Sequence, residues 1–128
     1  MARIMSHAAQ LRRIRLELAR TPEFPDGSRE HGYEFIAPLT DDSLIDARAW
    51  RDAKSLCRVS RFAGEETETG TLHHVGGGWR FDYDGKTRDD DEPFFKLDRH
   101  PLTPGAYVSI TEHDGKMRPF KVVSVTRV

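Results

Sequence analysis

Apolar and polar residues alternate along several short stretches of the chain. Ile14, Leu16 and Leu18 are separated by charged residues, which is the period of a β-strand with one buried face. Tyr33 and Phe35 repeat the spacing in a second stretch. The first predicted strand begins at residue 11 and ends before residue 21. The others, in chain order, are residues 32–37, 57–62, 69–75, 79–84, 106–112 and 116–125.

One stretch has a helical period instead. Between Thr40 and Leu56, apolar residues recur at intervals of three and four, as one buried face of a helix requires. A single helix is therefore predicted near residues 43–56. The sequence allows three N-caps for this helix. One is Ser43, in a capping box with Asp46, and the others are Asp42 and Asp46. The apolar residues of this stripe are Ile45, Ala49, Trp50, Ala53 and Leu56.

The loop His113-Asp114-Gly115 predicts a hairpin between the last two strands. Glycine at its third position suits the left-handed conformation of a three-residue loop with a bulge. This loop length sets Val108 opposite Phe120, together with Glu112 opposite Lys116 and Ala106 opposite Val122.

Further along the last strand, Val123 and Val125 have the opposite phase to Phe120 and Val122. The strand therefore contains a bulge or is buried on both faces, as in a barrel, and the barrel is favoured.

The glycines at positions 76–78 predict a second hairpin. A loop of two residues pairs Leu72 with Phe81 and His74 with Trp79, whereas a loop of three pairs His73 with Phe81. The first pairing is favoured because it is apolar, and it buries His74 partly against Trp79.

These elements predict a mainly β protein, α+β by strict count. The expected architecture is a small antiparallel barrel, partly open or closed, of about seven strands with one helix. Residues 11–128 form a single β-rich domain, and residues 1–10, which show no clear period, form a weakly ordered extension.

Composition narrows the function classes. The 128 residues include 20 basic and 21 acidic side chains, a formal net charge of −1, which gives no bulk attraction to nucleic acid or an anionic membrane. A single cysteine, Cys57, excludes an intramolecular disulfide and is typical of a reducing compartment. No apolar run is long enough for a membrane span, so a cytoplasmic location is predicted.

No motif for a cofactor or metal is present. The glycine run lies between strands and opens no helix with a Lys-Ser/Thr pair, so it lacks a phosphate-binding motif. The six histidines show no ligand spacing within one element, and no calcium-loop motif occurs. Cys57 is expected to be a small core residue. We predict no catalytic residue, metal or cofactor.

Four segments resemble a known group of proteins. They are Ile14–Arg20 (IRLELAR), His31–Phe35 (HGYEF), Ile45–Trp50 (IDARAW) and Pro104–Ile110 (PGAYVSI). With them the chain resembles a family of small bacterial proteins that has no assigned function, from about residue 12 onward. The resemblance implies that residues 1–10 are an extension, and it supplies no activity or catalytic residues.

Three functions are weighed. The favoured hypothesis is a non-enzymatic binding or interaction module, with a protein partner or a second copy of the chain as its partner. The alternative is a small-molecule-binding barrel or small enzyme with a pocket lined by histidine and aromatic residues. A second alternative is nucleic-acid binding through Arg13 and Arg15 on the basic first strand. The candidate pocket residues are His31, Tyr33, His74, Trp79 and His100.

Overall fold

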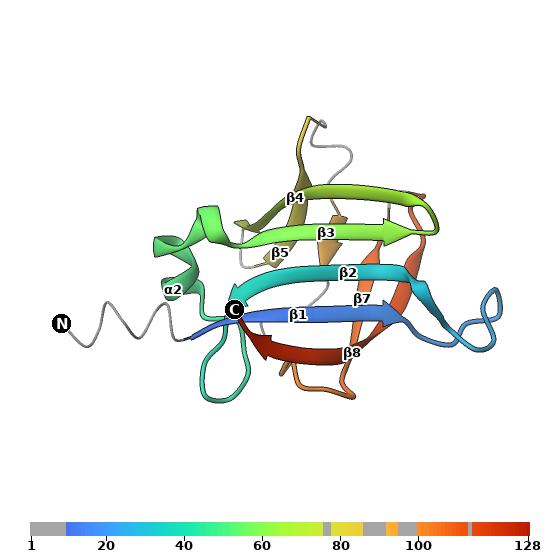
Figure 1. Ribbon diagram of the computed structural model, residues 1–128, viewed down its shortest axis with the longest axis horizontal. Helices are drawn as coiled ribbons and strands as arrows, with labels where there is room; N and C mark the ends of the chain where they lie inside the picture. Colours follow the sequence, from blue (N-terminus) through green and yellow to red (C-terminus); the bar gives the residue numbers. More distant parts are fainter. Residues whose placement is uncertain (1–9, 76–77, 86–91, 95–99, 113) are drawn as a thin grey trace.

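The computed structural model describes residues 10–75, 78–85, 92–94, 100–112 and 114–128. These residues form an antiparallel barrel of eight strands (Figure 1). Each strand pairs with the next along the chain, and the last pairs with the first. The strands are β1 Leu11–Leu18, β2 Ser28–Pro38, β3 Arg58–Ala63, β4 Glu66–Val75, β5 Gly78–Tyr83, β6 Glu92–Phe94, β7 Tyr107–Thr111 and β8 Met117–Arg127.

The predicted mainly β fold is confirmed. The eighth strand is the short β6, which pairs with β5 at three positions and with β7 at one. The predicted extension, residues 1–10, lies outside the described residues except for Gln10. The Gln10 side chain donates to Leu39 O at 3.2 Å and to Asp46 Oδ2 at 3.1 Å.

The helix is shorter than its apolar pattern predicts. Helix α2 spans Ala47–Asp52, and a separate 3₁₀ turn, η1, spans Lys54–Leu56. Asp46 is the N-cap, and its Oδ1 accepts a hydrogen bond from Ala49 N at 3.0 Å. Ser43 has a φ of 66°, which lies outside the helical region and keeps the helix from starting there.

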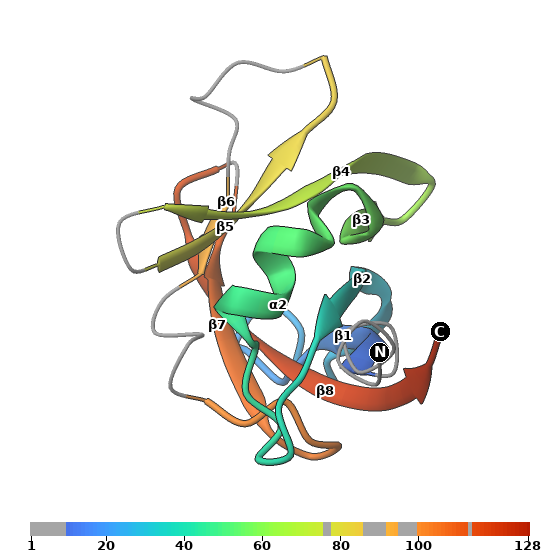
Figure 2. The same ribbon diagram turned by 90° about the vertical axis from the view of Figure 1, so that its left-hand side faces the viewer.

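The apolar stripe also ends early. Ala49 and Trp50 are buried, but Leu56 is 55% exposed, because the chain leaves the α-helical conformation at Ala53 (φ −131°) and the stripe does not continue through the 3₁₀ turn. Figure 2 shows α2 lying over one end of the barrel.

The C-terminal hairpin has the predicted register. Val108 pairs with Phe120, Glu112 N donates to Lys116 O at 3.0 Å, and Val122 N donates to Ala106 O at 2.8 Å. Gly115 has a φ of 80°, the left-handed conformation that the loop requires.

The last strand, β8, contains the predicted bulge and also closes the barrel. The ladder between β1 and β8 shifts so that Arg15 pairs with Ser124 and Leu16 with Val122, which leaves Val123 as an extra, bulged residue. Val125 then lies opposite Ile14 and packs against the core. The bulge therefore reverses the phase of β8 while the strand closes the barrel.

The hairpin of β4 and β5 has the favoured two-residue pairing. Leu72 pairs with Phe81 and His74 with Trp79. Gly78 belongs to β5, and glycines 76 and 77 lie outside the described residues.

Large side chains fill the barrel. The aromatic side chains of β5, Trp79, Phe81 and Tyr83, are buried. Phe81 packs against two rings of β2, stacked on Tyr33 at 5.1 Å and edge to face with Phe35 at 5.3 Å. The largest fully buried side chains include Trp79, Tyr33, Tyr83, Phe35, Phe81, Phe120, Leu72 and Leu102. Within the described part of the chain, no helix is long and apolar enough to cross a membrane.

Gly32 is required by the close approach of β1 to β2. A Cβ at this position would lie 2.0 Å from Leu16 O and 3.0 Å from Phe62 Cζ. We expect Gly32→Ala to lower the free energy of unfolding by about 3 kcal/mol, because backbone atoms must move apart. Gly64→Ala is the control, since it meets no atom within 4 Å and adds only the strain of a φ of 63°, about 1 kcal/mol. Urea unfolding measures both, and equal losses would contradict this account.

Candidate functional site

A cluster of charged and polar side chains closes the end of the barrel away from α2. His31 and Tyr33 on β2, Arg61 on β3 and Arg118 on β8 all face the interior there. They converge on Glu112, which follows β7 and is only 4% exposed. Figure 1 places α2 at one end of the barrel and the β1–β2 connection at the other.

Glu112 receives hydrogen bonds on both carboxylate oxygens. Tyr33 Oη donates to Oε2 at 2.7 Å, and His31 Nε2 lies 2.9 Å from the same oxygen. Arg61 Nη2 donates to Oε2 at 3.2 Å, and Arg118 Nη1 donates to Oε1 at 3.0 Å. The carboxylate therefore connects three strands, β2, β3 and β8, to the end of β7.

A second layer of carboxylates surrounds the two arginines. Arg118 Nη2 contacts Asp114 Oδ2 at 2.8 Å and Glu23 Oε1 at 3.7 Å. Arg61 Nη1 lies 3.5 Å from Glu68 Oε1. The charges thus alternate in sign outward from Glu112, which is how a buried ion cluster offsets its cost of desolvation.

This network keeps Glu112 ionised. Burial raises the pKa of its carboxyl, but the hydrogen bonds from His31 and Tyr33 and the positive charges near it outweigh burial and lower the pKa to about 2. The hydrogen bond from Arg118 likewise holds the pKa of Asp114 below its usual value. A general acid or base near neutral pH needs a pKa near that pH, so Glu112 is placed to stabilise the fold rather than to transfer protons.

The predicted pocket residues fall into separate groups. His31 lies between the rings of Phe24 (6.3 Å) and Phe120 (5.7 Å) and joins Tyr33 in the Glu112 cluster. His74 and Trp79 lie at the α2 end. His100 is exposed in the connection after β6. The structure therefore does not bring these five side chains to one pocket.

The α2 end of the barrel is packed with aromatic rings. His74 lies 4.3 Å from Trp79 between ring centroids, as the sequence predicts, and Trp50 meets Trp79 edge to face at 5.4 Å. Trp50 Nε1 donates to Leu72 O at 3.1 Å. These contacts are those of a core that α2 covers.

The two predicted basic residues of β1 have different surroundings. Arg15 Nε binds Glu17 Oε2 at 2.8 Å, and its guanidinium lies 4.4 Å from the ring centroid of Phe62. Arg13 is exposed at a shallow hollow of about 270 Å³ between β1, β2 and β3. Arg15 is therefore already neutralised within the fold, whereas Arg13 is not.

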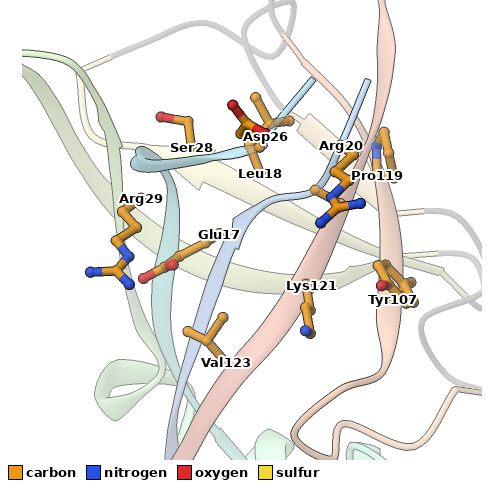
Figure 3. A pocket seen from close by; sticks show the side chains of 12 residues that line it. Glu17, Leu18, Arg20, Asp26, Ser28, Arg29, Tyr107, Pro119, Lys121 and Val123 are labelled. Atoms are coloured by element: carbon orange, nitrogen blue, oxygen red, sulfur yellow. The ribbon is translucent and has the colours of Figure 1, made fainter. Parts of the chain in front are cut away.

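A larger hollow of about 590 Å³ lies on the outside of the barrel (Figure 3). It opens where the ladder between β1 and β2 shifts, after Glu17 pairs with Gly32 and before Leu18 pairs with Ser28. Its lining residues are Glu17, Leu18, Ala19, Arg20, Asp26, Gly27, Ser28, Arg29, Tyr107, Pro119, Lys121 and Val123.

Three cations lie around this hollow, Arg20, Arg29 and Lys121. Within the described part of the chain, their side chains form no ion pair or hydrogen bond, although Glu17 lies opposite Lys121 in the β1–β8 ladder. Figure 3 shows Arg20 and Lys121 on one side of the hollow and Arg29 on the other, beside Glu17. Sequence reasoning missed these residues. The one local sequence signal for this hollow is Tyr107, a large aromatic residue at a position of β7 that faces outward.

Two further candidate chemistries have no support in the geometry. Cys57 is fully buried, and burial raises the pKa of its thiol to about 11, which agrees with its expected place in the core. Among the described residues, no group of three or more His, Cys, Asp or Glu side chains is arranged to hold a metal ion.

Comparison of the chain with models of protein families, with curated proteins and with solved structures finds no match. The resemblance to small bacterial proteins of unassigned function therefore stays a prediction.

The Glu112 cluster predicts a loss of stability in acid. The pKa of Glu112 in the folded state lies below its ordinary value of 4.5, so its contribution is complete above about pH 5 and is lost as the pH falls toward 2. Glu112→Gln removes the buried carboxylate that Arg61 and Arg118 share, and leaves them only their outer partners Glu68, Asp114 and Glu23. We expect Glu112→Gln to lower the free energy of unfolding by about 3–5 kcal/mol near pH 7. Near pH 3 the unchanged protein has itself lost part of the Glu112 contribution, so the two proteins are expected to differ less in stability.

Urea unfolding at the two pH values measures this effect. Asp114→Asn is the matched control, because Asp114 is exposed and its loss is expected to cost less than about 1 kcal/mol. A Glu112→Gln variant as stable as the unchanged protein near pH 7 would show that the cluster is not a stabilising centre.

Cys57 is predicted to be unreactive in the folded protein. Its raised pKa, from 9.0 to about 11, lowers the thiolate fraction near pH 8 by about a hundredfold, and burial blocks access as well. Labelling with iodoacetamide, followed by mass spectrometry, is expected to be slow in buffer and fast in guanidinium chloride. Rapid labelling of the folded protein would place the thiol at the surface instead.

Proposed function

We propose that this protein is a non-enzymatic binding module that holds a protein partner in the hollow between β1, the β1–β2 connection, β7 and β8. The proposal is supported chiefly by one contrast. The barrel interior is filled by side chains, whereas the 590 Å³ hollow lies on the outside, and its three cations form no ion pair with any residue that the structure describes. Concave surfaces of this size are typical of binding sites.

The pocket alternative has less support. It needs His31, Tyr33, His74, Trp79 and His100 around one cavity, and they belong to three separate places. The 590 Å³ and 270 Å³ hollows described above are lined by none of these five side chains. The His31–Glu112 pair is enclosed by Phe24, Phe120 and the two arginines, which leaves it a structural role.

The nucleic-acid alternative is weakened for a different reason. It relies on Arg13 and Arg15, and Arg15 already pairs with Glu17 and covers Phe62. Among the residues that the structure describes, Arg13 forms no ion pair, so it leaves one available positive charge on this face of β1. A cytoplasmic location remains part of the proposal and is supported by the free thiol of Cys57.

Site-specific photo-crosslinking tests the proposal. We would replace Tyr107, which is 60% exposed at the hollow, with p-benzoylphenylalanine. Asp82, exposed on β5 on the other side of the barrel, is the control position. We expect a discrete protein adduct from position 107 and none from position 82. The captured protein, once purified, is expected to form a complex of defined stoichiometry with the unmodified chain.

Two results would overturn the proposal. One is the same set of adducts from both positions, which would show that the hollow selects no partner. The other is a turnover activity that disappears on substitution of a single side chain, which would make the protein an enzyme.

A further inference from the structure

We propose that the outer hollow recognises an acidic segment of its protein partner, with carboxylates held by Arg20, Lys121 and Arg29 and an apolar side chain placed against Tyr107 and Val123. This inference rests on the proposed function and names the chemistry of the partner. It depends on three properties of the hollow: its unpaired cations, its apolar wall and its rigid backbone.

The cations come from three parts of the chain. Arg20 follows β1, Arg29 lies on β2 and Lys121 lies on β8, and all three are exposed. Arg20 and Lys121 are on the same side of the hollow (Figure 3), where their like charges repel each other, and Glu17 lies opposite Lys121 in the β1–β8 ladder. A carboxylate bound between them would relieve that repulsion.

An apolar wall adjoins these charges. Tyr107 pairs with Lys121 across the β7–β8 ladder and is 60% exposed. The bulge in β8 turns Val123 outward, where it is 37% exposed, and Pro119 completes the wall. An apolar side chain of a partner would remove this surface from water.

Backbone contacts hold the hollow in shape. Ala19 N donates to Pro119 O at 3.0 Å, which ties the end of β1 to β8. On the other side, Gly27 has a φ of 72°, and a Cβ there would lie 2.5 Å from Leu18 O. Because these contacts fix the backbone of the walls, the conformational entropy lost on binding comes mainly from ordering the lining side chains.

The lining also contains acids, and they favour a polypeptide over a nucleic acid. Glu17 and Asp26 lie in the same hollow as the three cations. A nucleic acid brings a phosphate with every nucleotide and would meet these carboxylates, with only three unpaired cations to offset the repulsion. A peptide segment can place acidic residues only opposite the cations and neutral or basic residues opposite Glu17 and Asp26.

Selection from a random peptide library tests the inference. Folded protein is used to select 12-residue peptides by display, and the same selection is run on Arg20→Glu/Lys121→Glu. The control is Arg48→Glu/Arg51→Glu on α2, which changes net charge equally at two exposed positions remote from the hollow. Ser28→Trp, which fills the hollow, is the blocking variant. Circular dichroism melting confirms that each variant is folded.

We expect the unchanged protein to enrich peptides with Asp or Glu beside an apolar residue. Their affinity is expected to fall by about tenfold or more in Arg20→Glu/Lys121→Glu and in Ser28→Trp, and to stay within about twofold in Arg48→Glu/Arg51→Glu. The charge-reversed variant is expected to select basic peptides instead.

Other outcomes separate the two levels of the proposal. Peptides without acidic bias that still lose binding in Ser28→Trp would overturn the acidic segment and leave the binding hollow in place. Peptides unaffected by Ser28→Trp would overturn both. A fluorescent 12-nucleotide oligothymidine that binds more tightly than any selected peptide, and is lost in Arg20→Glu/Lys121→Glu, would make nucleic acid the occupant.

Discussion

The ladder between β1 and β8 closes the sheet on itself, and the other features of the barrel depend on it. Arg12 pairs with Arg127 at one end of the ladder, and Leu18 pairs with Phe120 at the other. Closure means that inward side chains of both strands share one limited interior, so the chain must fill it with rings and aliphatic groups. The same ladder places β8 beside β1 on the outer surface, which is where the larger hollow lies.

The two ends of the barrel are closed by different physical means. At one end α2 covers an aromatic core in which the indole of Trp50 is anchored to a backbone carbonyl. At the other end the closure is electrostatic and centres on a single carboxylate, Glu112. Protonation of Glu112 would remove the charge that holds this ionic closure together, whereas the contacts of Trp50 with Leu72 and Trp79 involve no carboxylate.

Local patterns predicted much of the fold. Alternation identified the buried faces of β1 and β2, and loop length identified the register of both the β4–β5 and the β7–β8 hairpins. The length of α2 was overestimated because periodicity does not detect the unusual backbone angles at Ser43 and Ala53. Of the candidate site residues, His74 packs against Trp79, and His31 and Tyr33 share the Glu112 carboxylate. Their centre, Glu112, was missed because an acidic residue beside a hairpin loop normally faces water. The hollow depends on a register shift that no local pattern indicates.

The β1–β8 ladder also has a kinetic consequence. The hairpins β3–β4, β4–β5 and β7–β8 join residues that are close in the sequence, whereas β1 meets β8 only after the chain has turned through the whole barrel. Contacts between such distant residues form slowly, because the loop-closure entropy must be overcome first. The outer hollow includes residues from both strands of this ladder, near the end where Leu18 pairs with Phe120. A newly made chain would thus acquire most of its secondary structure before it has any surface to offer a partner, so recognition would be reserved for chains that have finished folding.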